Sequence, residues 1–240
     1  TRFKHVERDD MDGASDKYCI ETTTGTIFNS GASIKTDWNR KTIDYPSQKT
    51  EEDVADFNAK LENGRIVSGT IFKSWMNGTR PFEISYNADG TMKQTRYNDI
   101  SEYDGSDDWD NHTFVWENGY LTKVKCESMD AVSTFAYDKT TTIPAPFDKA
   151  LDLNMLMLLE EAEFFDGTNG QILNVLAIGG KLGTRSKGLI KEYHCDWTED
   201  TPFTLKMTYK KLTSDEVIVE VNHYEGNHLS FGHKWTIKRS

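Results

Sequence analysis

The sequence predicts an all-β protein, an antiparallel up-and-down meander that forms a barrel or a strongly curved sheet. Three observations predict it: a recurring hairpin turn, stretches in which apolar and polar residues alternate, and a composition of 12% aromatic residues with only 5 prolines in 240 residues. The turns are Asn63-Gly64, Asp89-Gly90 and Asn118-Gly119. Asn-Gly and Asp-Gly supply the positive φ that tight hairpins need. Proline is rare in sheets because it cannot donate to a ladder.

The first sixty residues form the less regular part of a single domain spanning 1–240. Residues 1–20 are expected to be an irregular lead-in, and 21–40 weak strands broken at Gly25 and Gly31. Pro46 and the acidic run Glu51–Asp53 predict a loop with one helical turn over 41–60. The repeat-containing meander is expected over 61–240.

The clearest strands lie between Arg65 and Asp138, where apolar residues recur at every second position, as in Phe82, Ile84 and Tyr86. Residues 139–149 predict a break. The apolar run Leu151–Leu159 follows, either as a short helix or as a buried extended segment, and we expect 147–163 to pack in or over the barrel.

The last third returns to strands, with a valine row at positions 217, 219 and 221. Register follows from keeping one apolar face together. This favours a three-residue loop, Gly226–His228, which aligns the row with Ile237, Trp235 and His233.

Several segments resemble known repeats and a known family. Phe82–Lys93, Thr113–Val124 and Thr134–Asp138 resemble YD-type (RHS-like) repeat units. Leu151–Asn154, followed by Ile178–Lys187, is similar to the Ile-Asp-Leu-Asn and Gly-Lys-Arg-Ser-Lys-Asn-Leu pattern of a Bacteroidetes family of secreted lipoproteins. That family is of unknown function and is described as having a porin-like fold. This sequence departs from the pattern by inserting Leu182-Gly183 and by carrying Gly188 where Asn is usual.

The resemblance implies a porin-like fold and export to the outer membrane or periplasm, with a lipidated cysteine upstream of Thr1. It transfers no catalytic residue. The fold name does not imply a membrane-spanning barrel, because the expected strands carry frequent Lys and Glu and show no lipid-facing apolar band.

The acidic segment Glu102–Asn111 is the best metal candidate in the sequence. Asp104, Asp107, Asp108 and Asp110 offer oxygen ligands of the kind that Ca²⁺ prefers. Their spacing does not match an EF-hand loop, so we favour a solvated hairpin loop and predict no metal site.

Histidine and cysteine patterns carry no strong catalytic signal. His223 and His233 share a face in the favoured register, with His228 in the loop, and two imidazoles are too few for a zinc site. His194, Cys195 and Asp196 are adjacent, and adjacent strand residues face opposite sides, so they cannot form a nucleophile and base. Cys19, Cys126 and Cys195 lack a CxxC pair, which favours three buried thiols over one disulfide with one thiol.

The glycine-rich segment Gly179–Gly188 has its Gly-Lys pair at the wrong place for a P-loop, so a flexible connection is expected. Tryptophan can stack on sugars, and Trp109, placed in the acidic loop, is the first exposed candidate. The other tryptophans, expected in the core or barrel wall, are Trp38, Trp75, Trp116, Trp197 and Trp235.

The net charge of −11 argues against nucleic-acid partners. No catalytic residue and no cofactor is predicted. The favoured function is a non-enzymatic binding or scaffold module, with a glycan or another surface protein as partner. The alternatives are a carrier of a small apolar ligand and a glycan-acting hydrolase. The barrel interior separates them: a filled interior favours the scaffold, an apolar cavity the carrier, and converging carboxylates the hydrolase.

Overall fold

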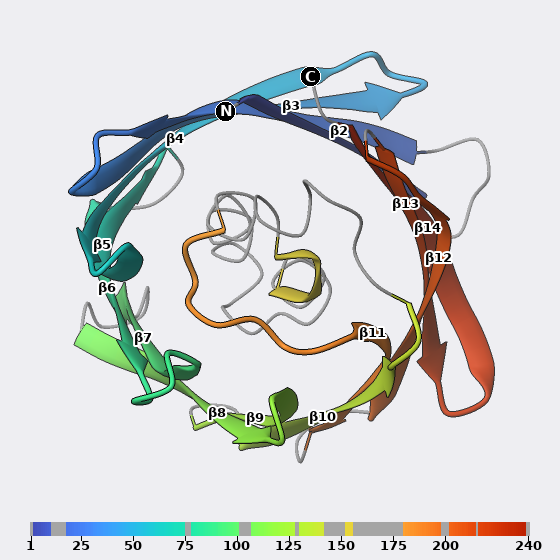
Figure 1. The fold of residues 1–240 in the computed structure, drawn as a ribbon. Helices are drawn as coiled ribbons and strands as arrows, with labels where there is room; N and C mark the ends of the chain where they lie inside the picture. Colours follow the sequence, from blue (N-terminus) through green and yellow to red (C-terminus); the bar gives the residue numbers. More distant parts are fainter. Residues whose placement is uncertain are drawn as a thin grey trace.

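The fold is a single antiparallel sheet rolled into an open barrel (Figure 1). The computed structural model describes residues 2–10, 18–74, 78–100, 107–127, 130–141, 152–155, 180–197, 202–214 and 216–238. The strands in these ranges are β1 (Arg2–Asp10), β2 (Tyr18–Asn29), β3 (Ser33–Tyr45), β4 (Thr50–Glu62), β5 (Arg65–Lys73), β6 (Thr79–Tyr86), β7 (Met92–Ile100), β8 (Asp107–Glu117), β9 (Tyr120–Cys126), β10 (Ala131–Asp138), β11 (Leu189–Trp197), β12 (Phe203–Leu212), β13 (Glu216–Glu225) and β14 (His228–Lys238).

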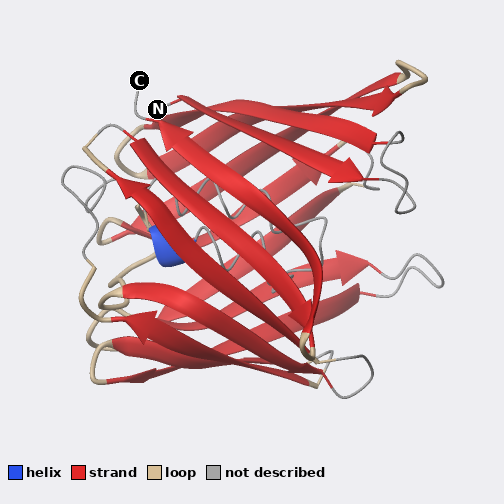
Figure 2. Ribbon diagram, turned by 90° about the vertical axis from the view of Figure 1, so that its right-hand side faces the viewer, coloured by secondary structure: helices blue, strands red, loops and turns tan. Residues whose placement is uncertain are grey.

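Each strand pairs with its neighbours in sequence, so the up-and-down meander is confirmed. The sheet curls until β1 and β14 come close, but no backbone pairing between them is described, so the barrel is not closed. The strands are steeply tilted, as a rolled sheet requires (Figure 2). No helix in the described ranges is long and apolar enough to cross a bilayer.

The wall buries its inner face and exposes its outer face. In β4, Ala55, Phe57 and Ala59 are buried, whereas Asp56 and Asn58 between them are exposed. The same alternation runs along β6, β12 and β13. The core is therefore the lumen of the barrel. Its largest fully buried side chains are Tyr97, Tyr193, Phe57, Ile34, Ile66, Ile71, Leu121 and Leu153.

Part of the chain between β10 and β11 lies inside this lumen (Figures 1 and 2). Leu153–Met155 form a single helical turn, and Asp152 Oδ1 accepts a hydrogen bond from Met155 N at 3.1 Å. Asn154 donates to Gly188 O at 2.9 Å and accepts from Ile190 N at 2.9 Å. For residues 152–155 the structure bears out packing inside the barrel; the rest of 147–163 is outside the described residues.

Two expectations for the first sixty residues were wrong, whereas strands over 21–40 are present, although β2 runs unbroken through Gly25. Residues 2–10 and 18–20 lie in β1 and β2 instead of an irregular lead-in, and the acidic run Glu51–Asp53 lies in β4 instead of a loop. The physical reason is cross-strand charge pairing, which no local pattern reveals. Arg40 contacts Asp53 at 2.8 Å and Lys41 contacts Glu52 at 3.5 Å, so basic positions of β3 face acidic positions of β4.

The expected register of the last hairpin is confirmed, and the expected loop length is not. Val217, Val219 and Val221 pair with Ile237, Trp235 and His233. The loop, however, has two residues, Gly226-Asn227, because His228 already pairs with Glu225. A register shift between His223 and Tyr224 restores the common apolar face.

Candidate functional site

The glycine-rich segment is a brace and not the flexible connection expected from its composition. We call residues 181–188 the brace. Its backbone bonds to three successive hairpins: Ile66 N donates to Lys181 O at 3.1 Å, Thr184 N to Gly90 O at 2.8 Å, and Lys187 N to Gly119 O at 2.9 Å. The contacts recur every three residues. Neighbouring hairpins are two strands apart, about 10 Å, which is the reach of three extended residues.

Side chains of the brace reinforce the same contacts. Thr184 Oγ1 donates to Asp89 O at 3.0 Å, and Lys187 Nζ donates to Asn118 O at 3.0 Å. Ser186 Oγ accepts from Leu121 N at 3.2 Å. Because the amides of Thr184 and Lys187 are committed to turn carbonyls, they do not form a phosphate cradle.

A ladder of four aromatic side chains supports these hairpins from the wall. Each reaches the preceding strand and donates to a backbone carbonyl just inside the turn end. The bonds are Tyr86 to Ile66 O at 2.6 Å, Trp116 to Met92 O at 2.7 Å, Tyr137 to Leu121 O at 2.8 Å, and Tyr209 to Ile190 O at 2.7 Å. Burial raises the pKa of Tyr86, Tyr137 and Tyr209, so these phenols stay protonated donors.

The described part of the acidic segment, residues 107–111, lies in a strand and not in the expected loop. Asp107, Asp108 and Asp110 belong to β8, which pairs with β7, and Asp104 lies outside the described residues. The run of acidic residues suggested a loop, but backbone pairing with β7 makes residues 107–111 part of a strand.

Among the side chains that the structure describes, which do not include that of His233, the histidines and the adjacent triple show no catalytic arrangement. His194 is exposed and lies 3.0 Å from Thr204 Oγ1, whereas Cys195 is buried, so the expected opposition of faces is confirmed. His223 stacks near Phe203 with ring centroids 4.9 Å apart. His228 starts β14 and is not in a loop, which corrects the expectation. Cys19, Cys126 and Cys195 form no disulfide with one another.

Trp109 lies in β8 and is half-buried, which corrects its expected place in a loop. The guanidinium of Arg96, on the neighbouring strand, lies 4.7 Å from the indole centroid. Arg96 Nε also donates to Asn111 Oδ1 at 3.1 Å, and Arg96 Nη1 donates to Glu83 Oε2 at 3.5 Å. The guanidinium is therefore held from three sides on the outer face.

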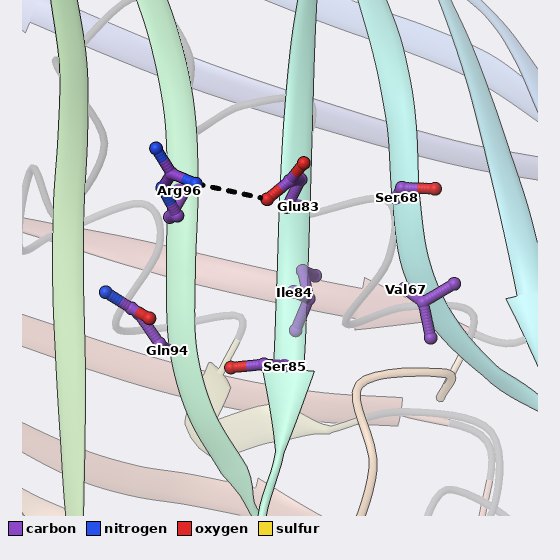
Figure 3. Close-up of a pocket in the computed structure, with 7 residues that line it drawn as sticks. All are labelled: Val67, Ser68, Glu83, Ile84, Ser85, Gln94 and Arg96. Atoms are coloured by element: carbon purple, nitrogen blue, oxygen red, sulfur yellow. Dashed lines mark hydrogen bonds and ion pairs between the residues drawn. The ribbon is translucent and has the colours of Figure 1, made fainter.

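A hollow of about 360 Å³ adjoins this cluster on the outer face of β5–β7. Figure 3 shows Glu83 and Arg96 joined across the strands beside Gln94 and Ser85. The small side chains Ser68 and Ser85 leave a depression between longer neighbours. The lining residues are Val67, Ser68, Glu83, Ile84, Ser85, Gln94 and Arg96. Hydroxyl, amide, carboxylate and guanidinium groups thus offer both donors and acceptors within one recess.

Sequence reasoning missed this hollow, although a signal for it exists. The Asp89-Gly90 turn fixes β6 against β7, and this register sets Glu83 opposite Arg96 and Ser85 opposite Gln94. If the strand pairing had been continued outward from this turn, it would have placed the polar side chains of Glu83, Ser85, Gln94 and Arg96 together on the outer face.

A second hollow, of about 430 Å³, lies at the turn end, beside Asn63, Arg65, Asp89 and Thr184. Two of its polar side chains already interact with other residues of the protein. Arg65 lies over the Tyr86 ring at 4.9 Å, and hydrogen bonds from Thr91 hold the pKa of Asp89 below its usual value. We therefore take the outer hollow as the candidate binding site.

Comparison with known proteins supports the fold. No protein-family model and no curated protein sequence matches this chain. A crystal structure of a porin-like protein from Bacteroides uniformis superimposes with a TM-score of 0.58 and 15% sequence identity, covering 99% of this chain and 94% of that chain. This chain therefore has the porin-like architecture of that protein, which the sequence resemblance implied.

Proposed function

We propose that this protein is a non-enzymatic binding module of the bacterial cell envelope and that its outer hollow binds polyhydroxylated ligands, with glycans as the partner class. The observation that carries the proposal is the recess beside Arg96 and Trp109. Sugar hydroxyls both donate and accept hydrogen bonds, and the lining of the hollow offers groups of both kinds.

The hollow is suited to binding because its side chains are held before a ligand arrives. Three strands of one sheet carry them, and Arg96 is fixed by Glu83, Asn111 and the Trp109 ring. Such pre-organisation lowers the entropic cost of binding.

The lumen favours a binding or scaffold module over a carrier. Apolar residues of the inner wall, such as Ile71, Val124 and Val219, are fully buried, and 152–155 pack among the buried residues of the core. In a carrier of an apolar ligand, the apolar side chains of the inner wall would line a cavity that the ligand can enter.

Two acids that the structure describes on the inner side of the wall, Asp53 and Asp152, have partners that fit structural roles. Asp53 pairs with Arg40, and Asp152 accepts from the Met155 amide. Hydrolysis of glycosidic bonds needs two carboxyl groups that flank the substrate. These two are engaged with the fold, which supports the non-enzymatic proposal.

The outer wall suggests that the barrel faces water. Asp56, Lys60, Glu83 and Lys210 all lie on outward positions, and a Lys or Arg facing lipid at the bilayer midplane costs about 2–4 kcal/mol. We propose attachment through a lipidated cysteine upstream of Thr1, with YD-like repeat units forming the hairpins. The purified chain should be monodisperse without detergent, and a requirement for detergent would contradict this view.

The glycan proposal is tested by screening the purified chain on an array of neutral and acidic oligosaccharides, followed by calorimetry on the best ligand. Arg96→Ala and Gln94→Ala should each weaken binding about tenfold, the effect of losing one or two hydrogen bonds. Lys206→Ala is the matched control, since Lys206 lies 4.6 Å from the Tyr224 ring on β12 and β13. The proposal fails if no oligosaccharide binds, or if Lys206→Ala weakens binding as much as Arg96→Ala.

A further inference from the structure

Three side chains of different chemistry meet on the inner face of β8 and β9. His112 pairs directly with Cys126 across these strands, and Asp110 lies two residues before His112 on the same face. One ligand atom from each residue, a carboxylate oxygen, an imidazole nitrogen and a sulfur, lies within 4.8 Å of the other two. The cluster lies at the end of the barrel opposite the brace, because Cys126 ends β9 there.

The individual distances are close to those of a coordination shell. His112 Nδ1 is 3.7 Å from Asp110 Oδ2, and Cys126 Sγ is 3.5 Å from Asp110 Oδ1. Tetrahedral zinc with bonds of about 2.0–2.3 Å sets its ligand atoms about 3.4–3.7 Å apart. The two distances involve different oxygens of Asp110, and with one ligand atom per residue all three atoms lie within 4.8 Å of one another, so an ion would draw the side chains together by about 1 Å.

The cluster is largely enclosed, and Asp110 is its most exposed member. The side chain of His112 is 1% exposed and that of Asp110 is 12% exposed, while Cys126 is buried. Three protein ligands leave the fourth tetrahedral position for water, which can enter beside Asp110.

We propose that Asp110, His112 and Cys126 form a binding site for Zn²⁺ or a divalent ion of similar softness. Sulfur and imidazole ligands select zinc and cobalt over calcium and magnesium, which prefer oxygen. Binding requires the Cys126 thiolate, so the thiol proton leaves to solvent as the ion enters. This site is independent of the outer hollow and of its proposed glycan partner.

The test uses Co²⁺ as a spectroscopic probe and Zn²⁺ as competitor on the purified full chain. The wild-type protein should bind one equivalent of Co²⁺ with a sulfur-to-cobalt charge-transfer absorption, and Zn²⁺ should displace it. Ca²⁺ at the same concentration should not. Cys126→Ser should abolish the absorption and weaken Zn²⁺ binding by about 100-fold or more, since loss of even an outer-shell partner costs 10–100-fold.

Cys195→Ser is the matched control, because Cys195 is also a buried cysteine, on β11. It should bind Co²⁺ as the wild type does. Asp110→Asn keeps the sulfur and the shape, so it should weaken binding while retaining the absorption, and it decides the matter if Cys126→Ser does not fold. The proposal is overturned if the wild type shows no sulfur–cobalt absorption, if Cys195→Ser loses it equally, or if Asp110→Asn binds with wild-type affinity.

Discussion

The strands β5–β11 and the strands β1–β4 belong to one sheet but are held in different ways. Across β5–β11, the brace crosses the turn end and bonds to three hairpins that are far from it in sequence. In β1–β4, the ion pairs of Arg40 with Asp53 and of Lys41 with Glu52 join β3 to β4. The comparison suggests that the curvature of the first region depends on an inner layer, whereas the second depends on pairing within the sheet.

The largest expected effect comes from crowding the brace. Gly183 has a φ of +90°, and an added Cβ would lie 2.5 Å from Gly90 O and 2.7 Å from the Tyr86 ring. Gly183→Ala should therefore destabilise the protein by about 3 kcal/mol, from backbone strain together with overpacking. The measurement is urea unfolding followed by circular dichroism.

Gly31→Ala is the control from the other region. Gly31 also has a positive φ, +84°, but nothing lies within 4 Å of an added Cβ. It should cost about 1 kcal/mol, from strain alone. Equal losses in the two variants would show that the brace does not constrain the turn end.

The next effect concerns the bond between the helical turn and β11. Asn154→Ala removes one donor and one acceptor, leaving Gly188 O and Ile190 N buried without this partner. The expected loss is about 2–4 kcal/mol. Asp53→Asn, which weakens a part-exposed ion pair of β3 and β4, should cost under about 1 kcal/mol in the same assay. A ranking in the reverse order would contradict the proposed difference between the regions.

These two regions also differ in how far the sequence foretells them. The hairpins at Asn63-Gly64, Asp89-Gly90 and Asn118-Gly119 were predictable, since positive φ is a local property of residue type and all three glycines have it. Strands over 21–40 were predicted only as weak, and β1 and β4 were not predicted, because charged residues obscure the alternation and the pairing of Lys41 with Glu52 exists only in the folded sheet. Turn-forming residues can be recognised in a single sequence, whereas predicting cross-strand pairs requires knowing which strands are neighbours in the sheet.

The candidate sites also differ in whether they could be predicted from local sequence. The resemblance drew attention to Leu151–Asn154 and to residues 178–187, and in the structure Asn154 bonds to Gly188, the residue directly after the second segment. The hollow beside Arg96 and the cluster of Asp110, His112 and Cys126 escaped prediction, because both depend on registers between neighbouring strands. Asp110 was singled out for its acidic neighbours, whereas the groups that approach it come from β8 and β9.

A smaller effect is expected along the aromatic ladder. Tyr86→Phe, Tyr137→Phe and Tyr209→Phe each remove one hydroxyl that donates to a backbone carbonyl. Each should cost about 1 kcal/mol of unfolding free energy, and the three losses should be nearly additive because the bonds do not share atoms. Tyr224→Phe on β13 is the control, and it should be nearly neutral. If the hydrogen bonds of the ladder do not contribute to stability, all four variants will have the same free energy of unfolding as the wild type.

The smallest effect is a pH dependence with opposite signs at two carboxyls beside the brace. Burial raises the pKa of Asp152 above its ordinary 3.8, whereas hydrogen bonds from Thr141 and Thr140 lower that of half-buried Asp138. The stabilisation from Asp152 is fully present below pH 3.8 and is lost as pH rises through its folded pKa. The stabilisation from Asp138 is present above pH 3.8 and is lost as pH falls through its folded pKa.

Urea unfolding from about pH 3 to pH 8 separates the two groups. Asp152→Asn should remove part of the decline in stability above pH 3.8, because the amide keeps an acceptor for Met155 N without acquiring charge. Asp138→Asn should instead flatten the decline in stability at acid pH, and by less, since solvent screens a partly exposed carboxylate. If Asp152→Asn leaves the slope above pH 3.8 unchanged, burial beside the brace does not control this carboxyl, and the inner layer of β5–β11 is more open to water than its contacts imply.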